Sequence, residues 1–235
     1  MLVKLLLSLF SLLWAPQVRI PGPGGRPAVS GGSSFALIAS TSATGIMTTP
    51  GITTTGANLL IVEELIYNIS SAIAPTDLIN GGASGNTWSQ CGPVYTQGGV
   101  NGSIWYSASP HAGANHTFSV AGTSYSTMFV SAWSGAAASS PCDEYSGAGI
   151  ASGTTVLPGS ITTAAADLLI SFVGGAGLTS ASASPTMTNI NSLFTGQDEL
   201  GADGYVKQGS AGVFSVTWTV SPSATAVAAI AAFKP

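Results

Sequence analysis

Short apolar runs, broken every few residues by Gly, Ser, Thr, Asn or Pro, limit most strongly what this chain can fold into. "NLLIV" (58–62) and "DLLIS" (167–171) are long enough for a strand covered on both faces but too short for a helix. "GSIWYSA" (102–108) and "VFSVTWTV" (213–220) alternate, as a strand with one buried face does. With 30 glycines and 13 prolines among 235 residues, this pattern predicts an all-β protein.

The pattern also repeats. "GITTTGANLLIV" (51–62) matches "GSITTAAADLLIS" (159–171), with Asn58 opposite Asp167. Each copy leads to a hairpin-like pair of runs that ends near an aromatic residue, Trp133 or Phe233. This order suggests an internal duplication, although chance similarity in a chain of few residue types is a competing explanation.

Each half offers about four strands, and neither half would bury its inner face alone. Two such sets facing each other predict a two-sheet antiparallel β-sandwich of about eight strands, of the jelly-roll or Ig-like type. We expect this body to span residues 35–235.

The N-terminal 20 residues differ from the body. "VKLLLSLFSLLWA" (3–15) has the outline of a bacterial signal peptide, but Trp14 and Pro16 flank the expected cleavage point unfavourably. The alternative is a retained docking arm, whose contacts would come from apolar side chains. These are Leu5, Leu6, Leu7, Phe10, Leu13 and Trp14. A Pro/Gly/Ser linker at 21–34 separates this N-terminal segment, whether signal peptide or docking arm, from the body.

Charge argues against nucleic acid as a partner. Between Pro27 and Val206 there is no Lys or Arg, and the body carries nine acids against two lysines. Such a body cannot replace the counterions of a phosphate backbone. A surface kept soluble by hydroxyls and amides is instead typical of extracellular or particle-bound proteins.

Two cysteines, Cys91 and Cys142, are too few for a zinc site and form no C-x-x-C motif. A single disulfide and two buried free thiols both fit the sequence.

Residues that could carry catalysis are sparse. His111 and His116 stand in "SPHAGANHTF" (109–118), which we expect to be a loop between strands, and no G-x-S-x-G motif presents a serine. The acidic doublets could supply glycosidase carboxylates only if they flank a cleft. These doublets are Glu63-Glu64, Asp143-Glu144 and Asp198-Glu199. We therefore expect no enzyme and no cofactor, with a glycan hydrolase acting through Asp143 or Glu144 as the remaining catalytic hypothesis.

One loop-like stretch, "GQDELGADGY" (196–205), could bring Asp198, Glu199 and Asp203 around a structural calcium ion. The spacing fails the EF-hand template, so solvated loop acids are the simpler interpretation.

Aromatic residues cluster in the first half and give the best indication of binding, because exposed rings stack on sugar faces. We expect Trp105 and Trp133, which lie in strand-like runs, to be buried. Trp88 and Tyr145 lie in turn-like stretches and are the candidate exposed pair for glycan binding.

Six stretches taken in order resemble a known group of proteins. They are "TTTGANLLIV", "SGNTWSQ", "GSIWYSASPHAGANHTFSV", "FVSAWSGAAASSPCDEYSG", "LPGSITTAAADLLIS" and "AVAAIAAFK". The body is similar to the Gly/Ser/Thr-rich β-sandwich proteins of tailed-phage virions and of bacterial secreted or surface proteins. Cys142 stands where that resemblance implies an apolar residue, which leaves a Cys91–Cys142 bridge as a local feature.

The resemblance implies an exposed structural or adhesive module and no catalytic residues. Our leading expectation is a bacteriophage virion protein of the capsid-decoration or head-fibre type. Its arm would bind a capsid or other virion protein, and its body would form a homo-oligomer such as a trimer on the virion surface. The alternative is a secreted adhesin or carbohydrate-binding module that binds cell-surface polysaccharide after loss of a signal peptide.

Overall fold

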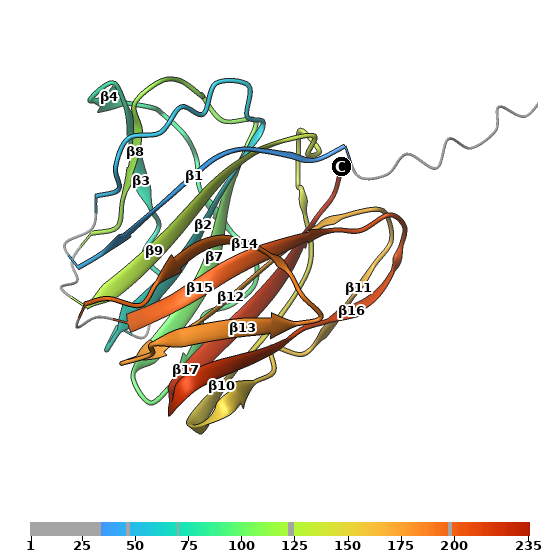
Figure 1. The fold of residues 1–235 in the computed structure, drawn as a ribbon. Helices are drawn as coiled ribbons and strands as arrows, with labels where there is room; N and C mark the ends of the chain where they lie inside the picture. The colour runs from blue at the N-terminus through green and yellow to red at the C-terminus, as the bar shows by residue number, and fades with distance from the viewer. Residues whose placement is uncertain (1–33, 46–47, 70, 122–124, 197–198) are drawn as a thin grey trace, which may run out of the picture.

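The computed structural model describes residues 34–45, 48–69, 71–121, 125–196 and 199–235 (Figure 1). The expected docking arm and almost all of the linker therefore lie outside the described residues. The described part of the chain forms strands and no helix, which confirms the all-β prediction. No helix within these ranges is long and apolar enough to cross a membrane.

The strands of the first half are β1 (Ala36–Thr44), β2 (Leu59–Tyr67), β3 (Thr76–Ile79), β4 (Gly82–Ala83), β5 (Ser89–Gln90), β6 (Tyr95–Gln97), β7 (Val100–Ala108), β8 (His116–Ser119) and β9 (Ser126–Ser134). Those of the second half are β10 (Cys142–Val156), β11 (Ser160–Thr163), β12 (Leu168–Ala176), β13 (Ser180–Ser184), β14 (Thr188–Leu193), β15 (Glu199–Lys207), β16 (Gly212–Ser215) and β17 (Thr217–Phe233). All pairings between these strands are antiparallel.

Each half builds one large sheet in the same order. The first-half sheet runs β1-β9-β2-β7-β5, and the second-half sheet runs β10-β17-β12-β15-β14. The register agrees as well, because Leu59 faces Trp133 and Leu168 faces Phe233. The repeat seen in the sequence is thus a repeat of strand topology.

A pair of threonines from the repeated motif extends this correspondence to hydrogen bonds. The hydroxyl of Thr54 donates to the Gly113 carbonyl and accepts from the Gly113 amide, at 3.2 and 3.0 Å. The hydroxyl of Thr163 does the same with Gly212, at 3.2 and 3.3 Å. Agreement at this level favours duplication over chance similarity.

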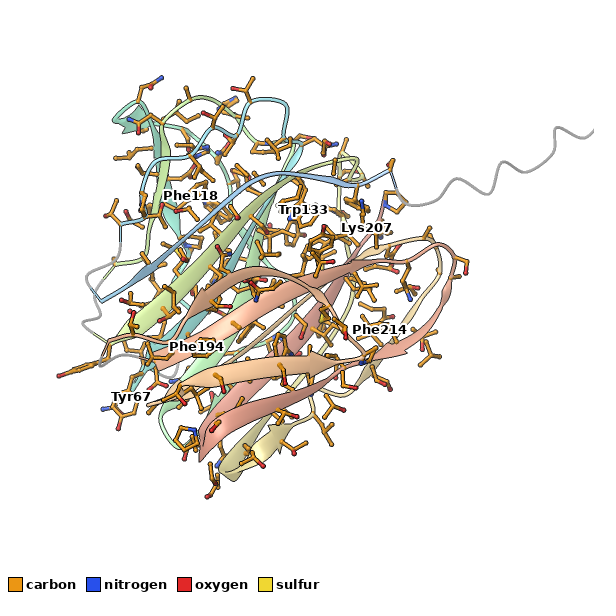
Figure 2. All side chains as sticks on the ribbon, in the orientation of Figure 1. Tyr67, Phe118, Trp133, Phe194, Lys207 and Phe214 are labelled. Atoms are coloured by element: carbon orange, nitrogen blue, oxygen red, sulfur yellow. A yellow bond between two sulfur atoms is a disulfide. The ribbon has the colours of Figure 1, made fainter. Side chains whose placement is uncertain are left out.

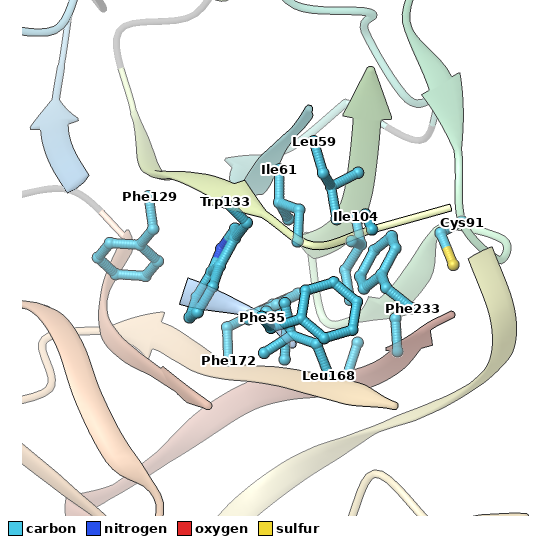
Figure 3. Close-up of a cluster of buried hydrophobic side chains, with 14 of the residues drawn as sticks. Phe35, Leu59, Ile61, Cys91, Ile104, Phe129, Trp133, Leu168, Phe172 and Phe233 are labelled. Atoms are coloured by element: carbon cyan, nitrogen blue, oxygen red, sulfur yellow. The ribbon is translucent and has the colours of Figure 1, made fainter. Parts of the chain in front are cut away.

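The two large sheets face each other and enclose the main core. Its side chains come from both halves, and Figure 3 shows Trp133, Phe35, Phe172 and Phe233 converging between the sheets. Each is at most 2% exposed. Burying a side chain of this size contributes about 1.5–3 kcal/mol, so this contact between halves stabilises the whole sandwich.

The outer face of each large sheet is covered by its own half. Over the first sheet, β8 supplies Phe118, which packs with Leu60 and Val130. In Figure 2, Phe118 lies on the outer side of this sheet, and Trp133 lies nearer the centre of the molecule. Over the second sheet, β11 and the first part of β17 supply Ile161 and Trp218.

Three expectations about the sandwich need correction. The strands are more numerous than eight, because each half adds short outer strands. The "GSIWYSA" strand, β7, is buried at both its faces over most of its length, since outer and inner layers both cover it. The expected hairpin of β8 and β9 does not form: β8 pairs with β3, whereas β9 pairs with β1 and β2. Phe118 and Val130 then meet across two layers.

Candidate functional site

The candidate glycan-binding residue Tyr145 lies at a corner where the two halves are joined. Cys91 of the first half and Cys142 of the second form a disulfide, with their Cα atoms 5.9 Å apart. We call Cys91, Gly92, Tyr95, Cys142 and Tyr145 the disulfide corner. The structure thus places the two cysteines of the chain in one bond rather than as free thiols.

At the disulfide corner, two tyrosines each pack against the opposite half of the sandwich. The Tyr145 ring lies against Gly92, so close that a Cβ there would stand 2.8 Å from Cδ2 of the ring. Gly92 also has a φ of 90°, a conformation that favours glycine. The Tyr95 ring lies over Gly147 in the same way. Glycine at both positions therefore lets a ring from one half lie flat on the backbone of the other.

Exposure separates these two rings. Tyr145 is 48% exposed, whereas Tyr95 is half-buried. Burial, together with the neighbouring Tyr145, raises the pKa of Tyr95 to about 12, so the Tyr95 phenol stays neutral at ordinary pH. Glu144 beside Tyr145 is exposed and can accept hydrogen bonds from hydroxyl groups. An exposed aromatic ring is a surface on which a sugar can stack.

Trp88, the other candidate for glycan binding, was predicted to be exposed but is half-buried. Its indole Nε1 donates to Oδ1 of Asp77 at 3.0 Å, and its ring meets Phe118 edge-on at 6.2 Å. The segment before β5 covers the outer face of the first sheet, and this draws the indole inward. Trp133 is fully buried as expected, and Trp105 is half-buried, donating to Glu64 at 3.0 Å.

His116 is the main site that the sequence interpretation missed. It was expected in a loop, but it lies in β8 with no exposed surface and stacks on Phe118 at 4.4 Å. Its Nδ1 contacts the Thr54 hydroxyl at 2.9 Å, and its Nε2 contacts Oδ2 of Asp77 at 2.6 Å. The alternation of His116, Phe118 and Val120 in "HTFSV" was the available signal, because it puts all three on one face.

The Thr54–His116–Asp77 arrangement has the order of a nucleophile, base and acid. Burial would raise the pKa of Asp77, but hydrogen bonds from His116, Ser84, Asn86 and Trp88 lower it below its usual value. Thr54 and His116 are 0% exposed and Asp77 is 7% exposed. No substrate can contact Thr54 in this conformation, so the arrangement joins β3, β8 and the segment before β2 within the outer layer. His111, by contrast, is exposed in a loop.

The two acidic doublets that the structure describes in full differ in burial. Neighbouring residues of a strand point to opposite faces, and Glu63 and Glu64 are buried on opposite sides of β2. Asp143 faces the buried Asp167 and lies 3.6 Å from the Nζ of Lys234, whereas Glu144 is exposed. Burial, then the hydrogen bond and charge of Asp143, raise the pKa of Asp167 to about 7.

The loop expected around calcium is a strand. Glu199 and Asp203 belong to β15 and are buried, while Asp198 lies outside the described residues. The carboxylate of Asp203 accepts hydrogen bonds from the backbone amide and side chain of Asn191, at 2.7 and 3.3 Å. Within the described ranges, no group of three or more His, Cys, Asp or Glu side chains is placed to hold a metal ion.

Comparison with known proteins adds little to this geometry. No family model and no curated protein matches the chain. Among solved structures, a conserved protein of unknown function from Pseudomonas aeruginosa PAO1 is 12% identical, over 90% of this chain and 84% of that chain. The TM-score of 0.26 is too low to support an argument about fold or function.

Proposed function

We propose that this protein is a non-enzymatic structural protein of a bacteriophage virion, of the capsid-decoration or head-fibre type. Residues 1–20, outside the described ranges, would bind the capsid or another virion protein. The sandwich would project from the virion surface, as a trimer or other homo-oligomer, and contact host glycans weakly through Tyr145. Many copies would make such weak contacts effective.

One observation carries this proposal. The side chains in the order of a nucleophile, base and acid, Thr54, His116 and Asp77, are buried inside the outer layer, whereas the Tyr145 ring is exposed at the surface. The resemblance to virion and surface proteins and the scarcity of charge support the same interpretation. The disulfide suits an oxidising location, of which a virion surface is one.

The disulfide equally favours the second candidate, a secreted adhesin or carbohydrate-binding module. The two candidates differ in the N-terminus of the working protein. Mass spectrometry of protein from purified particles should find a peptide that begins at Met1 in the virion protein. A mature terminus after about residue 15, in particle-free culture medium, would instead establish the secreted module.

Glycan contact is tested separately by changing Tyr145→Ala. Removing the open ring should lower binding to immobilised host polysaccharide by about fivefold or more, taking ~1–3 kcal/mol as the value of a stacking contact on an aromatic side chain. Tyr67→Ala is the matched control, because Tyr67 is 43% exposed on a different strand. Equal losses in both variants, or no loss in Tyr145→Ala, would contradict a role for the disulfide corner.

A further inference from the structure

Two carboxyl groups face each other across the main core. Glu63 projects inward from β2 of the first half, and Asp203 projects inward from β15 of the second half. Both residues are 0% exposed. They therefore form a polar contact within the largely apolar core between the two halves.

This contact requires a proton. Among the described residues, neither oxygen of the Glu63 carboxyl meets a hydrogen-bond donor of another residue, and the Asp203 carboxyl accepts bonds from the backbone and side chain of Asn191. Two carboxylates cannot bond each other without a proton between them, and two buried like charges repel. The two carboxyl groups can form a hydrogen bond when at least one of them is protonated.

Among the residues that the structure describes, no cation contacts the pair and replaces this proton. The inward face of β15 also carries Glu199 and Tyr205, and β7 carries Tyr106. Lys207 lies at the end of β15, where its Nζ donates to the Phe35 carbonyl at 3.2 Å. The other strands packed here have no charged or titratable side chain; these are β1, β9, β12, β14 and β17.

We propose that the Glu63–Asp203 pair is a proton-dependent latch between the two halves of the sandwich. The shared proton holds β2 against β15, and its loss at higher pH places repelling charges in the core and loosens the contact between the sheets. The Cys91–Cys142 disulfide keeps the halves connected when the latch is released. This inference stands whichever candidate function is correct.

The direction of the pH effect follows from burial. Desolvation raises the pKa of Asp203 to about 7, and desolvation, then the nearby Asp203, raise the pKa of Glu63 well above its usual value. In the unfolded chain both groups ionise near pH 4 to 4.5. Stability from the protonated pair is therefore complete below about pH 4 and is lost as the pH rises through 7 and above.

A reporter for the latch already lies in the interface. Trp133 of β9 packs edge-on against Tyr205 of β15 at 4.9 Å, so its indole senses the contact between halves. Trp218 lies in the outer layer of the second half and serves as the reference. Solvent exchange of each indole N–H can be followed by NMR between pH 6 and pH 9 and corrected for the intrinsic exchange rate.

We expect the protection of the Trp133 indole N–H from exchange to fall by at least about tenfold over this range. A tenfold change corresponds to ~1.4 kcal/mol in the free energy of opening. Trp218 should change little. In Glu63→Gln the amide bonds Asp203 without a shared proton, so Trp133 should stay protected at pH 9. Glu64→Gln is the matched control, because Glu64 is a buried acid of the same strand that faces the outer layer, and it should behave as the unchanged protein does.

Three results would overturn the latch. They are a Trp133 protection independent of pH in the unchanged protein, a full pH response in Glu63→Gln, and a response abolished by Glu64→Gln. If Glu63→Gln does not fold, Asp203→Asn tests the same pair from the other sheet. A pH series on the unchanged protein is enough to contradict the proposal, because it requires no variant to fold.

Discussion

His116 shows at the scale of one residue how a buried polar side chain holds the segments of the outer layer together. Its ring bonds Thr54 on one side and Asp77 on the other, and stacks on Phe118. Replacing His116→Ala removes all three contacts and leaves a cavity beside a buried carboxylate. We expect the free energy of unfolding to fall by about 3 kcal/mol in urea denaturation.

His111→Ala is the control for this change. His111 is exposed, and its Nδ1 contacts only the Ser84 carbonyl, at 2.6 Å. Its removal should alter the free energy of unfolding by no more than about 0.5 kcal/mol. If both histidine variants unfold at the same urea concentration as the unchanged protein, the buried contacts of His116 do not stabilise the outer layer.

At the scale of strands, the two large sheets approach closely where β12 lacks side chains. A Cβ at Gly174 would lie 2.0 Å from Cδ1 of Leu65 on β2. Gly174→Ala should therefore destabilise the protein by about 1–3 kcal/mol, because Leu65 must move within a packed core. Differential scanning calorimetry should show a lower melting temperature.

The double variant Gly174→Ala with Leu65→Ala isolates this contact. The two changes should cost less together than the sum of their separate costs, since the shortened side chain at position 65 leaves room for the new methyl group. Gly209→Ala is the control, because a Cβ at Gly209 meets nothing within 4 Å. Strict additivity of the two core changes would show that the sheets do not meet at Gly174 and Leu65.

At the scale of the molecule, the disulfide is a second covalent link between the two halves, in addition to the main chain. It closes a loop with a sequence separation of 51, so its removal should cost about 3–4 kcal/mol by restoring freedom to the unfolded chain. Urea denaturation of the variant with both Cys91→Ser and Cys142→Ser should show a lower midpoint. The unchanged protein under reducing conditions should match it, and an unaltered midpoint in both would mean that the bond does not constrain the unfolded chain.

The local sequence pattern was enough to predict the burial of some residues but not of others. Leu59 and Leu168 lie in strands buried on both faces because their short apolar runs admit no other placement in a β protein. Trp88 is different, since its turn-like neighbours are typical of an exposed site, yet a distant carboxylate, Asp77, provides a partner inside. The exposure of an aromatic residue in a loop depends on what the rest of the chain brings next to it.

The all-β class, the repeat and the facing of the two halves could be predicted, because they follow from the spacing of apolar residues and from the need to bury them. Which polar residues meet depends on the folded arrangement. His116 joins Thr54 and Asp77, and Glu63 meets Asp203, across separations that no local pattern encodes. The physical reason is that buried hydrogen-bonding groups find partners through the packing of whole layers, and that packing exists only in the folded chain.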